Sequence, residues 1–324
     1  MTQEQGNMSP GLRNNKIADE RERLVRKKKY LRLRAEMIQA IRSYFIEQGY
    51  LEVETPQIIN EVPPEVHIDP ITIGKKFLIT SPELCMKRLL SAGYKNIFQI
   101  TKCFRDGERG SLHLPEFTML EWYRTGIDYR ALMEESEALL LAVLNGLGME
   151  KSIRYRGKDF DFQVPWKRMT VEEAFGRYSS LGPDEAIREG KFDQIMVEKI
   201  EPNLGIDGPE FIYDYPESLA ALSRLKPGNE QVSERFELYV AGIELANGFS
   251  ELNNSLEQRE RFTREQGLRR GMDKPVYPLP NRFLASLENM PESAGIAFGL
   301  DRLAMIFTDR PVIDDVVTFT PEDL

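Results

Sequence analysis

Cysteine is nearly absent from this sequence. Its 324 residues include only Cys85 and Cys103, which are too few for a disulfide framework and lack the spacing of metal ligands. This scarcity agrees with a reducing compartment, and we expect both thiols to be buried as small apolar side chains.

Long apolar segments are absent as well. No run approaches the roughly 18 residues that a membrane-spanning helix requires. The polar start MTQEQGNMSP also lacks the apolar core of a signal peptide. The sequence therefore predicts a soluble, cytoplasmic protein without a membrane partner.

The chain has no excess of positive charge. It carries 43 basic and 52 acidic residues, a net charge of -9, which is unfavourable for a protein that must grip a nucleic-acid backbone. The segment 21–34 is an exception, with eight basic residues against one acid. Two interpretations remain open for it: a solvated start of a helix, or a docking strip for an acidic partner.

A nucleotide-binding phosphate loop is missing. The pair Gly157-Lys158 would need glycine at position 152 and Ser or Thr at position 159, but the sequence has Ser152 and Asp159. We predict a hairpin turn there instead.

The order of the predicted elements indicates an α+β fold. Strands follow one another with helices between groups, which favours an antiparallel sheet flanked by helices in one large domain. Residues 1–20 are polar, lack apolar periodicity and are predicted to form a flexible tail. The main predicted elements are helices at 37–45, 129–147, 255–270 and 300–307, and strands at 96–104, 117–124, 211–216, 235–252 and 295–299.

Two acids gather in the segment RFELYVAGIELANGFSEL. A hairpin turned at Ala241-Gly242 pairs Tyr239 with Glu244 and places Glu237 diagonally across from Glu244, roughly 7 Å away. Such carboxylates repel each other unless water or a cation separates them. Magnesium with substrate phosphates suits oxygen-only ligands; a solvated polar face is the alternative.

A third acid follows in the same segment. Asn247-Gly248 interrupts the second strand and allows close approach of a backbone. Glu251 lies beyond this break, where we expect it to receive a cationic group of a substrate.

Two further segments suit an anionic ligand. In GIAFGLDRLAMI a strand of small residues precedes a helix, whose first turn carries Arg302. A cation there opposes the helix dipole, so Arg302 is expected to face an anion, with a surface salt bridge as the alternative. In FRDGERGSLHLPEF, Arg105 ends a strand and offers bidentate donors, His113 lies near a terminal phosphate, and Phe117 offers a flat face to a purine.

Together these segments resemble the class II aminoacyl-tRNA synthetases, and among them the lysyl-tRNA synthetase catalytic domain. The resemblance spans residues 34 to about 319. GYLEVETP (49–56), FRDGERGSLHLPEF (104–117) and GIAFGLDR (295–302) are similar to the three motifs of the family, and ELANGFSEL (244–252) is similar to its lysine-specific segment.

The resemblance implies ATP and Mg²⁺ at the site. Arg105 and Arg302 are the implied catalytic residues: Arg105 contacts the α-phosphate and the substrate carboxylate, and Arg302 contacts the outer phosphates with His113. Phe117 stacks on adenine, and Glu237 and Glu244 are the implied magnesium ligands. The implied substrate-binding residues are Glu83, Glu121, Tyr123, Asn247, Glu251 and Ala297.

One position departs from the family pattern. The second motif normally carries glutamate where this sequence has Gly107, and Glu108 is next to it. Whether Glu108 replaces the missing carboxylate in binding ATP is left open by the sequence.

The short N-terminus selects a branch of the family. Lysyl-tRNA synthetases carry an anticodon-binding domain of about a hundred residues before the catalytic domain, whereas about thirty residues precede the resemblance here, so residues 21–324 are expected to form a catalytic domain alone. Similar short proteins activate lysine or (R)-β-lysine with ATP and transfer it to elongation factor P. Ala297 stands where the tRNA-charging enzymes have glycine, and is expected to favour β-lysine over α-lysine.

The resemblance also implies a homodimer through GYLEVETP, and tRNA is not expected as acceptor. Two alternatives remain: a truncated lysyl-tRNA synthetase paralogue that charges tRNA or a small amine, and a catalytically inactive paralogue that senses lysine.

Overall fold

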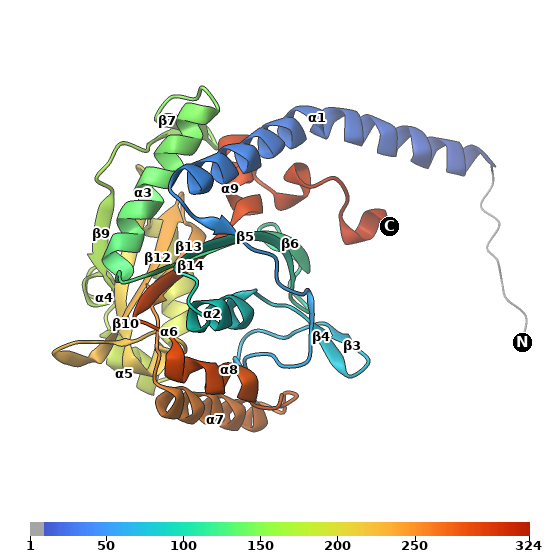
Figure 1. Cartoon of the computed structure of the whole chain (residues 1–324). Helices are drawn as coiled ribbons and strands as arrows, with labels where there is room; N and C mark the ends of the chain where they lie inside the picture. Colours follow the sequence, from blue (N-terminus) through green and yellow to red (C-terminus); the bar gives the residue numbers. More distant parts are fainter. Residues whose placement is uncertain (1–9) are drawn as a thin grey trace, which may run out of the picture.

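A large sheet forms the centre of the molecule (Figure 1). The computed structural model describes the backbone of residues 10–324 and the side chains from residue 19. Within this part the sheet has nine strands, antiparallel except for two pairs, β1–β5 and β10–β9. Its order is β1 (Leu51–Glu52), β5 (Asn96–Phe104), β6 (Glu116–Thr125), β14 (Ser293–Gly299), β13 (Ile243–Ser250), β12 (Asn229–Val240), β10 (Glu210–Pro216) and β9 (Lys167–Thr170), with β11 (Leu225–Lys226) beside β12.

Helices cover both faces of this sheet. The long helix α1 (Pro10–Glu47) packs with α3 (Tyr129–Gly146) and α9 (Leu300–Phe307) on one face, in a core cluster that extends from Met37 to Val317. On the other face lie α2 (Glu83–Ser91), α7 (Ser255–Gly271) and α8 (Asn281–Ser286), around Leu90 and Phe283. The predicted α+β fold is confirmed.

Smaller elements surround the sheet. Beyond β10 pack α4 (Val171–Tyr178), α5 (Pro183–Arg188) and α6 (Phe192–Ile195). A small sheet of β2 (Ile58–Ile59), β4 (Lys76–Leu78) and β3 (Thr72–Ile73) borders the face of the large sheet that carries α2. The strands β7 (Ser152–Tyr155) and β8 (Lys158–Asp161) form the predicted hairpin. Cys103 is buried as expected, but Cys85 is only half-buried.

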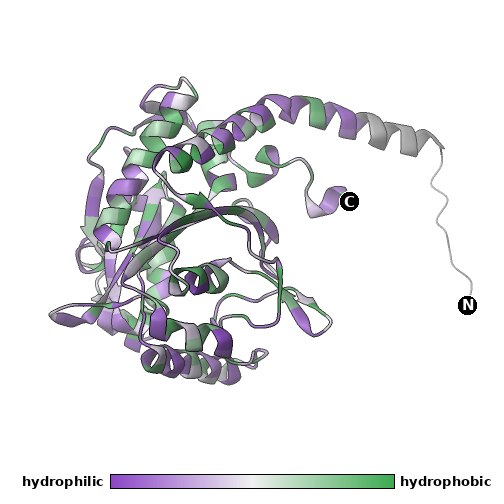
Figure 2. Ribbon diagram, in the orientation of Figure 1, coloured by the Kyte–Doolittle hydropathy of each residue, from purple (hydrophilic) through white to green (hydrophobic). Residues whose placement is uncertain are grey.

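Helix α1 projects away from the body at its N-terminal end (Figure 1). It begins at Pro10, so it overlaps the expected tail at 1–20, whose residues 1–9 lie outside the described part of the chain. Figure 2 shows that the helix α7 and the coloured part of α1 that projects from the body are largely hydrophilic. No helix in the described residues is both long and apolar enough to cross a membrane.

Three cations of the basic segment 21–34 turn inward to the chain itself. Arg23 pairs with Asp323 at 2.7 Å, and buried Lys27 donates to the Val317 carbonyl at 3.1 Å. Arg34 Nη2 pairs with Asp301 at 2.7 Å. Fewer cations of this segment are therefore available for docking than the sequence indicated. The exposed ones are Arg21, Arg26, Lys28, Lys29 and Arg32.

Candidate active site

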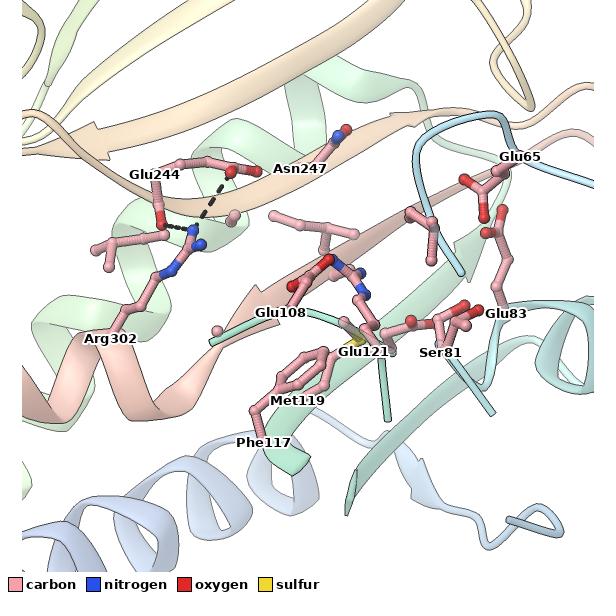
Figure 3. Close-up of a pocket in the computed structure, with 18 of the residues that line it drawn as sticks. Glu65, Ser81, Glu83, Glu108, Phe117, Met119, Glu121, Glu244, Asn247 and Arg302 are labelled. Carbon is pink, nitrogen blue, oxygen red and sulfur yellow. Dashed lines mark hydrogen bonds and ion pairs between the residues drawn. The ribbon is translucent and has the colours of Figure 1, made fainter. Parts of the chain in front are cut away.

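A cavity of about 260 Å³ opens on the face of the sheet that carries α2 (Figure 3). Its floor is made by β6, β13 and β14, and its rim by the β5–β6 loop, the start of α9 and the loop that follows β2. Phe117 and Arg302 border one end of the cavity, and Glu65 and Glu83 border the other.

One row of directly paired residues crosses the floor and continues into the neighbouring strand β12. Glu121 of β6 is opposite Ala297 of β14, Ala297 is opposite Asn247 of β13, and Asn247 is opposite Glu237 of β12. Because side chains alternate between the two faces of a sheet, opposed residues share a face. The register therefore brings together four residues that the sequence analysis had singled out.

A bulge in β13 adjusts this register. The hairpin pairs Tyr239 with Glu244 as predicted, but the register shifts by one residue next to it, so Glu237 lies opposite Asn247 and not Ala246. Glu244 and Asn247 are three residues apart, and a regular strand would turn them to opposite faces. The extra residue of the bulge keeps both on the cavity side.

Arg302 and His113 meet at the outer end of the cavity. Arg302 Nη1 donates to the backbone carbonyl of Glu244 at 2.7 Å and lies 3.3 Å from its carboxylate (Figure 3). Burial and the Arg302 charge lower the pKa of His113. Its Nε2 lies 2.6 Å from Arg302 Nη2, and since a guanidinium only donates, this nitrogen accepts. The two predicted phosphate contacts are thus neighbours.

Arg105 and Phe117 also lie together. The Arg105 guanidinium stands 5.1 Å from the centre of the Phe117 ring, and its Nη1 is 3.7 Å from Glu108. Gly107 has φ +72°, a left-handed conformation that is strained for glutamate. The next residue, Glu108, lines the cavity.

The two predicted magnesium ligands differ in their position relative to the cavity. Glu244 lines the cavity, whereas buried Glu237 lies outside the lining formed by the described residues and accepts hydrogen bonds from Arg235 at 2.6 Å and Tyr239 at 2.8 Å. Burial, Glu237 and Glu244 raise the pKa of Glu201 to about 7. In residues 10–324, no group of three metal-binding side chains is preassembled.

Acids border the inner end of the cavity. Buried Glu121 accepts a hydrogen bond from Tyr123 Oη at 2.9 Å, and its pKa is well above the ordinary value because of burial and the nearby Glu83. Glu83 and Glu65 point toward each other at this end of the cavity in Figure 3. Glu65 was not anticipated from the sequence.

Lys87 was not anticipated either. It is fully buried, with its ammonium 2.5 Å from Glu83 and in an ion pair with Glu251. Burial alone would lower the pKa of Lys87, but the charges of Glu251 and Glu83 outweigh the effect of burial and raise this pKa. Glu251 is thus paired with a residue of the protein and is not part of the cavity lining, whereas Glu65, Glu83 and Glu121 are the acids that line the inner end.

Gly295 of the floor lies in close contact with Tyr123 and Glu251. An added Cβ at this position would stand 2.2 Å from Tyr123 Cε1 and 2.5 Å from Glu251 Oε1. Only glycine fits there, because these distances are far below van der Waals contact.

The fold and this cavity define a class II synthetase. Residues 13–323 match the family model described as tRNA synthetases class II (D, K and N), and the chain belongs to this family. Similar proteins are named elongation factor P--(R)-beta-lysine ligase. That of Proteus mirabilis is 39% identical over 303 residues, which are 88% of this chain and 93% of the relative. Those of Haemophilus influenzae (strain PittGG) and Vibrio cholerae are each 38% identical, over 91% and 89% of this chain and 96% and 94% of the relatives.

Proposed function

We propose that this protein is an AMP-forming ligase that activates (R)-β-lysine with ATP and transfers it to a lysine side chain of elongation factor P. The observation that carries the proposal is the polarity of the cavity, with Arg302 toward one end, Glu83 and Glu121 toward the other, and Arg105 in the lining. A diamino acid fits this polarity because its carboxylate and its ammonium groups need opposite partners. The name shared by the relatives is the basis for proposing elongation factor P as the acceptor and (R)-β-lysine as the isomer.

In the first step the substrate carboxylate attacks the α-phosphate of ATP in line, which forms the acyl–phosphate bond and releases pyrophosphate. Arg105 stabilises the charge that develops on the phosphate, so the protein contributes mainly positioning and electrostatics. In the second step a neutral amine of the acceptor attacks the acyl carbon, and AMP leaves. Phe117 is the proposed platform for adenine.

A magnesium ion fits the acids near Glu244. Burial, and after it the charges of Glu237 and Glu244, raise the pKa of Glu201, and a cation would relieve the repulsion between these acids. Glu237 and Glu244 would hold the ion, which supplies charge neutralisation for the phosphates when bound.

The intact mass of elongation factor P tests the proposal. The factor is incubated with this protein, ATP and either α-lysine or β-lysine, with and without magnesium, and bulk tRNA is assayed in parallel. A lysine-sized mass gain that requires magnesium is expected. Acid-labile label on tRNA alone would favour the truncated synthetase, and no product on either acceptor would favour the inactive paralogue.

A homodimer is part of the proposal. Ile46, Leu51 and Ile58, which flank or belong to the first motif, are 61%, 52% and 49% exposed, and exposed apolar side chains suit an interface between subunits. Light scattering tests it, and a monomer mass would overturn it.

Replacing Ala297 by glycine is expected to shift the preference toward α-lysine by about ten- to 200-fold, the range for one methyl group in a pocket. Ala297 lies between Glu121 and Asn247 in the floor, so its methyl group limits how a substrate sits between these polar side chains. Pyrophosphate release with each isomer measures the preference, and an unchanged ratio would remove Ala297 from specificity.

The exposed cations of α1 are expected to speed transfer but not activation. High salt should slow modification of elongation factor P while pyrophosphate release stays constant, because salt screens exposed charges. Charge reversal of Lys28 and Lys29 should act in the same way, with Lys191→Glu, on a remote surface, as the control. Equal salt sensitivity of both steps would contradict this docking role.

A further inference from the structure

The loop between β2 and β3 carries an acid whose role neither the sequence motifs nor the family resemblance assigns. Glu65 lies on this loop and lines the cavity. Figure 3 shows its carboxylate directed toward that of Glu83, which comes from the start of α2. Two segments, the β2–β3 loop and the start of α2, thus present carboxylates to the same space at the inner end of the cavity.

A fully buried arginine fixes this loop. Arg269 of α7 donates from Nη1 to the Glu65 carbonyl at 2.6 Å and from Nη2 to Asp69 Oδ1 at 2.5 Å. Glu265 accepts from the Val66 amide at 3.0 Å. These contacts use the backbone of Glu65 and its neighbours, so the Glu65 carboxylate is held at the cavity by bonds in which it takes no part.

The same loop is tied to the second motif. The Asp106 amide donates to the Asp69 carbonyl at 2.7 Å, directly after Arg105. The position of Glu65 is therefore set relative to the group that, in the proposed function, binds the substrate carboxylate.

The charges around Glu65 call for an external cation. Burial and then Glu83 raise the pKa of Glu65 to about 7, with Arg105 and Arg235 opposing the rise and Glu265 adding to it. The internal ammonium at this end, Lys87, is already shared between Glu83 and Glu251. Two facing carboxylates of this kind are stabilised by a cation placed between them.

We propose that Glu65, together with Glu83, binds the ammonium group nearer to the carboxyl of the diamino acid, which makes Glu65 a specificity residue for that group. The inference rests on the proposed function, since it assumes an amino acid in this cavity. Its basis is that the Glu65 and Glu83 carboxylates face each other at the inner end of the cavity, and that the Glu65 loop is anchored beside Arg105. The distal ammonium of the substrate lies outside its reach, toward Glu121.

Two ligands separate this role from a structural one. β-Lysine has both ammonium groups, whereas 6-aminohexanoate has the distal ammonium and lacks the nearer one. The dissociation constant of each is measured by titration calorimetry for the wild-type protein, for Glu65→Gln and for the control Glu61→Gln, which lies on the same loop outside the cavity lining.

Glu65→Gln is expected to weaken β-lysine binding by about ten- to hundredfold, the range for a hydrogen bond to a charged group, and to leave 6-aminohexanoate binding within about twofold. The affinity of Glu65→Asp for β-lysine should lie between the affinities of Glu65→Gln and of the wild-type protein. Equal weakening of both ligands, or unchanged β-lysine binding, would overturn the role of Glu65. Failure of the wild-type protein to release pyrophosphate with any lysine isomer would instead overturn the proposed function.

Discussion

Replacement of Arg105 by alanine is expected to slow formation of the aminoacyl-adenylate by about a hundredfold or more, as loss of a preorganised anion-binding donor does. The guanidinium lies over Phe117 at the end of β5, where both the attacking carboxylate and the α-phosphate need a positive partner. Among the described residues, its contacts are the Phe117 ring and, at 3.7 Å, Glu108, so other donors are available to a substrate.

Pyrophosphate release at saturating ATP and β-lysine measures this effect. Arg105→Lys should recover only part of the rate, because an ammonium cannot replace the bidentate geometry of a guanidinium. Arg154→Ala is the matched control, since Arg154 is 67% exposed on the β7–β8 hairpin. A rate for Arg105→Ala within a few-fold of the control would exclude Arg105 from the chemical step.

Replacement of Lys87 by methionine is expected to lower the free energy of unfolding by about 3–5 kcal/mol, the usual effect of removing one partner from a buried ion pair. Methionine fills most of the volume of lysine, so the loss comes from charge. Glu251 would be left buried without a cation, and Glu83 would lose its contact at 2.5 Å.

Urea unfolding of the single and double variants tests this account. Lys87→Met with Glu251→Gln removes both charges and should be less destabilised than the sum of the two single changes, because the partners are coupled. The control is Lys158→Met, whose ion pair with Asp207 is exposed and should contribute about 0–1 kcal/mol. Additive single effects would show that Lys87 and Glu251 do not act as a pair.

Much of the floor of the cavity could be predicted from local sequence patterns. Short-range signals, such as turn residues and the alternation of apolar and polar side chains, predict the order of strands and the turn at Ala241-Gly242. The strand ends and the strand-to-helix junction likewise point to the motif residues Arg105 and Arg302. The register then brings Glu121, Ala297 and Asn247 into one row, as pairing of alternating strands requires.

The residues whose roles depend on tertiary packing could not be predicted from the sequence. Lys87 follows Glu83 by four residues, a spacing that is typical of a solvated ion pair on a helix surface, and only the approach of Glu251 shows that it is buried. Glu65 is held by Arg269, 204 residues away in the chain. The bulge near Glu244 adds a single residue to one strand, and no local pattern distinguishes it from a regular hairpin.

The closeness of Gly295 to Tyr123 and Glu251 has a consequence for redesign of the pocket. A library that varies the floor should leave position 295 as glycine, since any side chain there displaces the tyrosine and the buried carboxylate. Two residues further along the same strand, Ala297 faces the same cavity. Directed evolution toward other amino acids therefore has one adjustable floor position on β14 beside one that is closed to change.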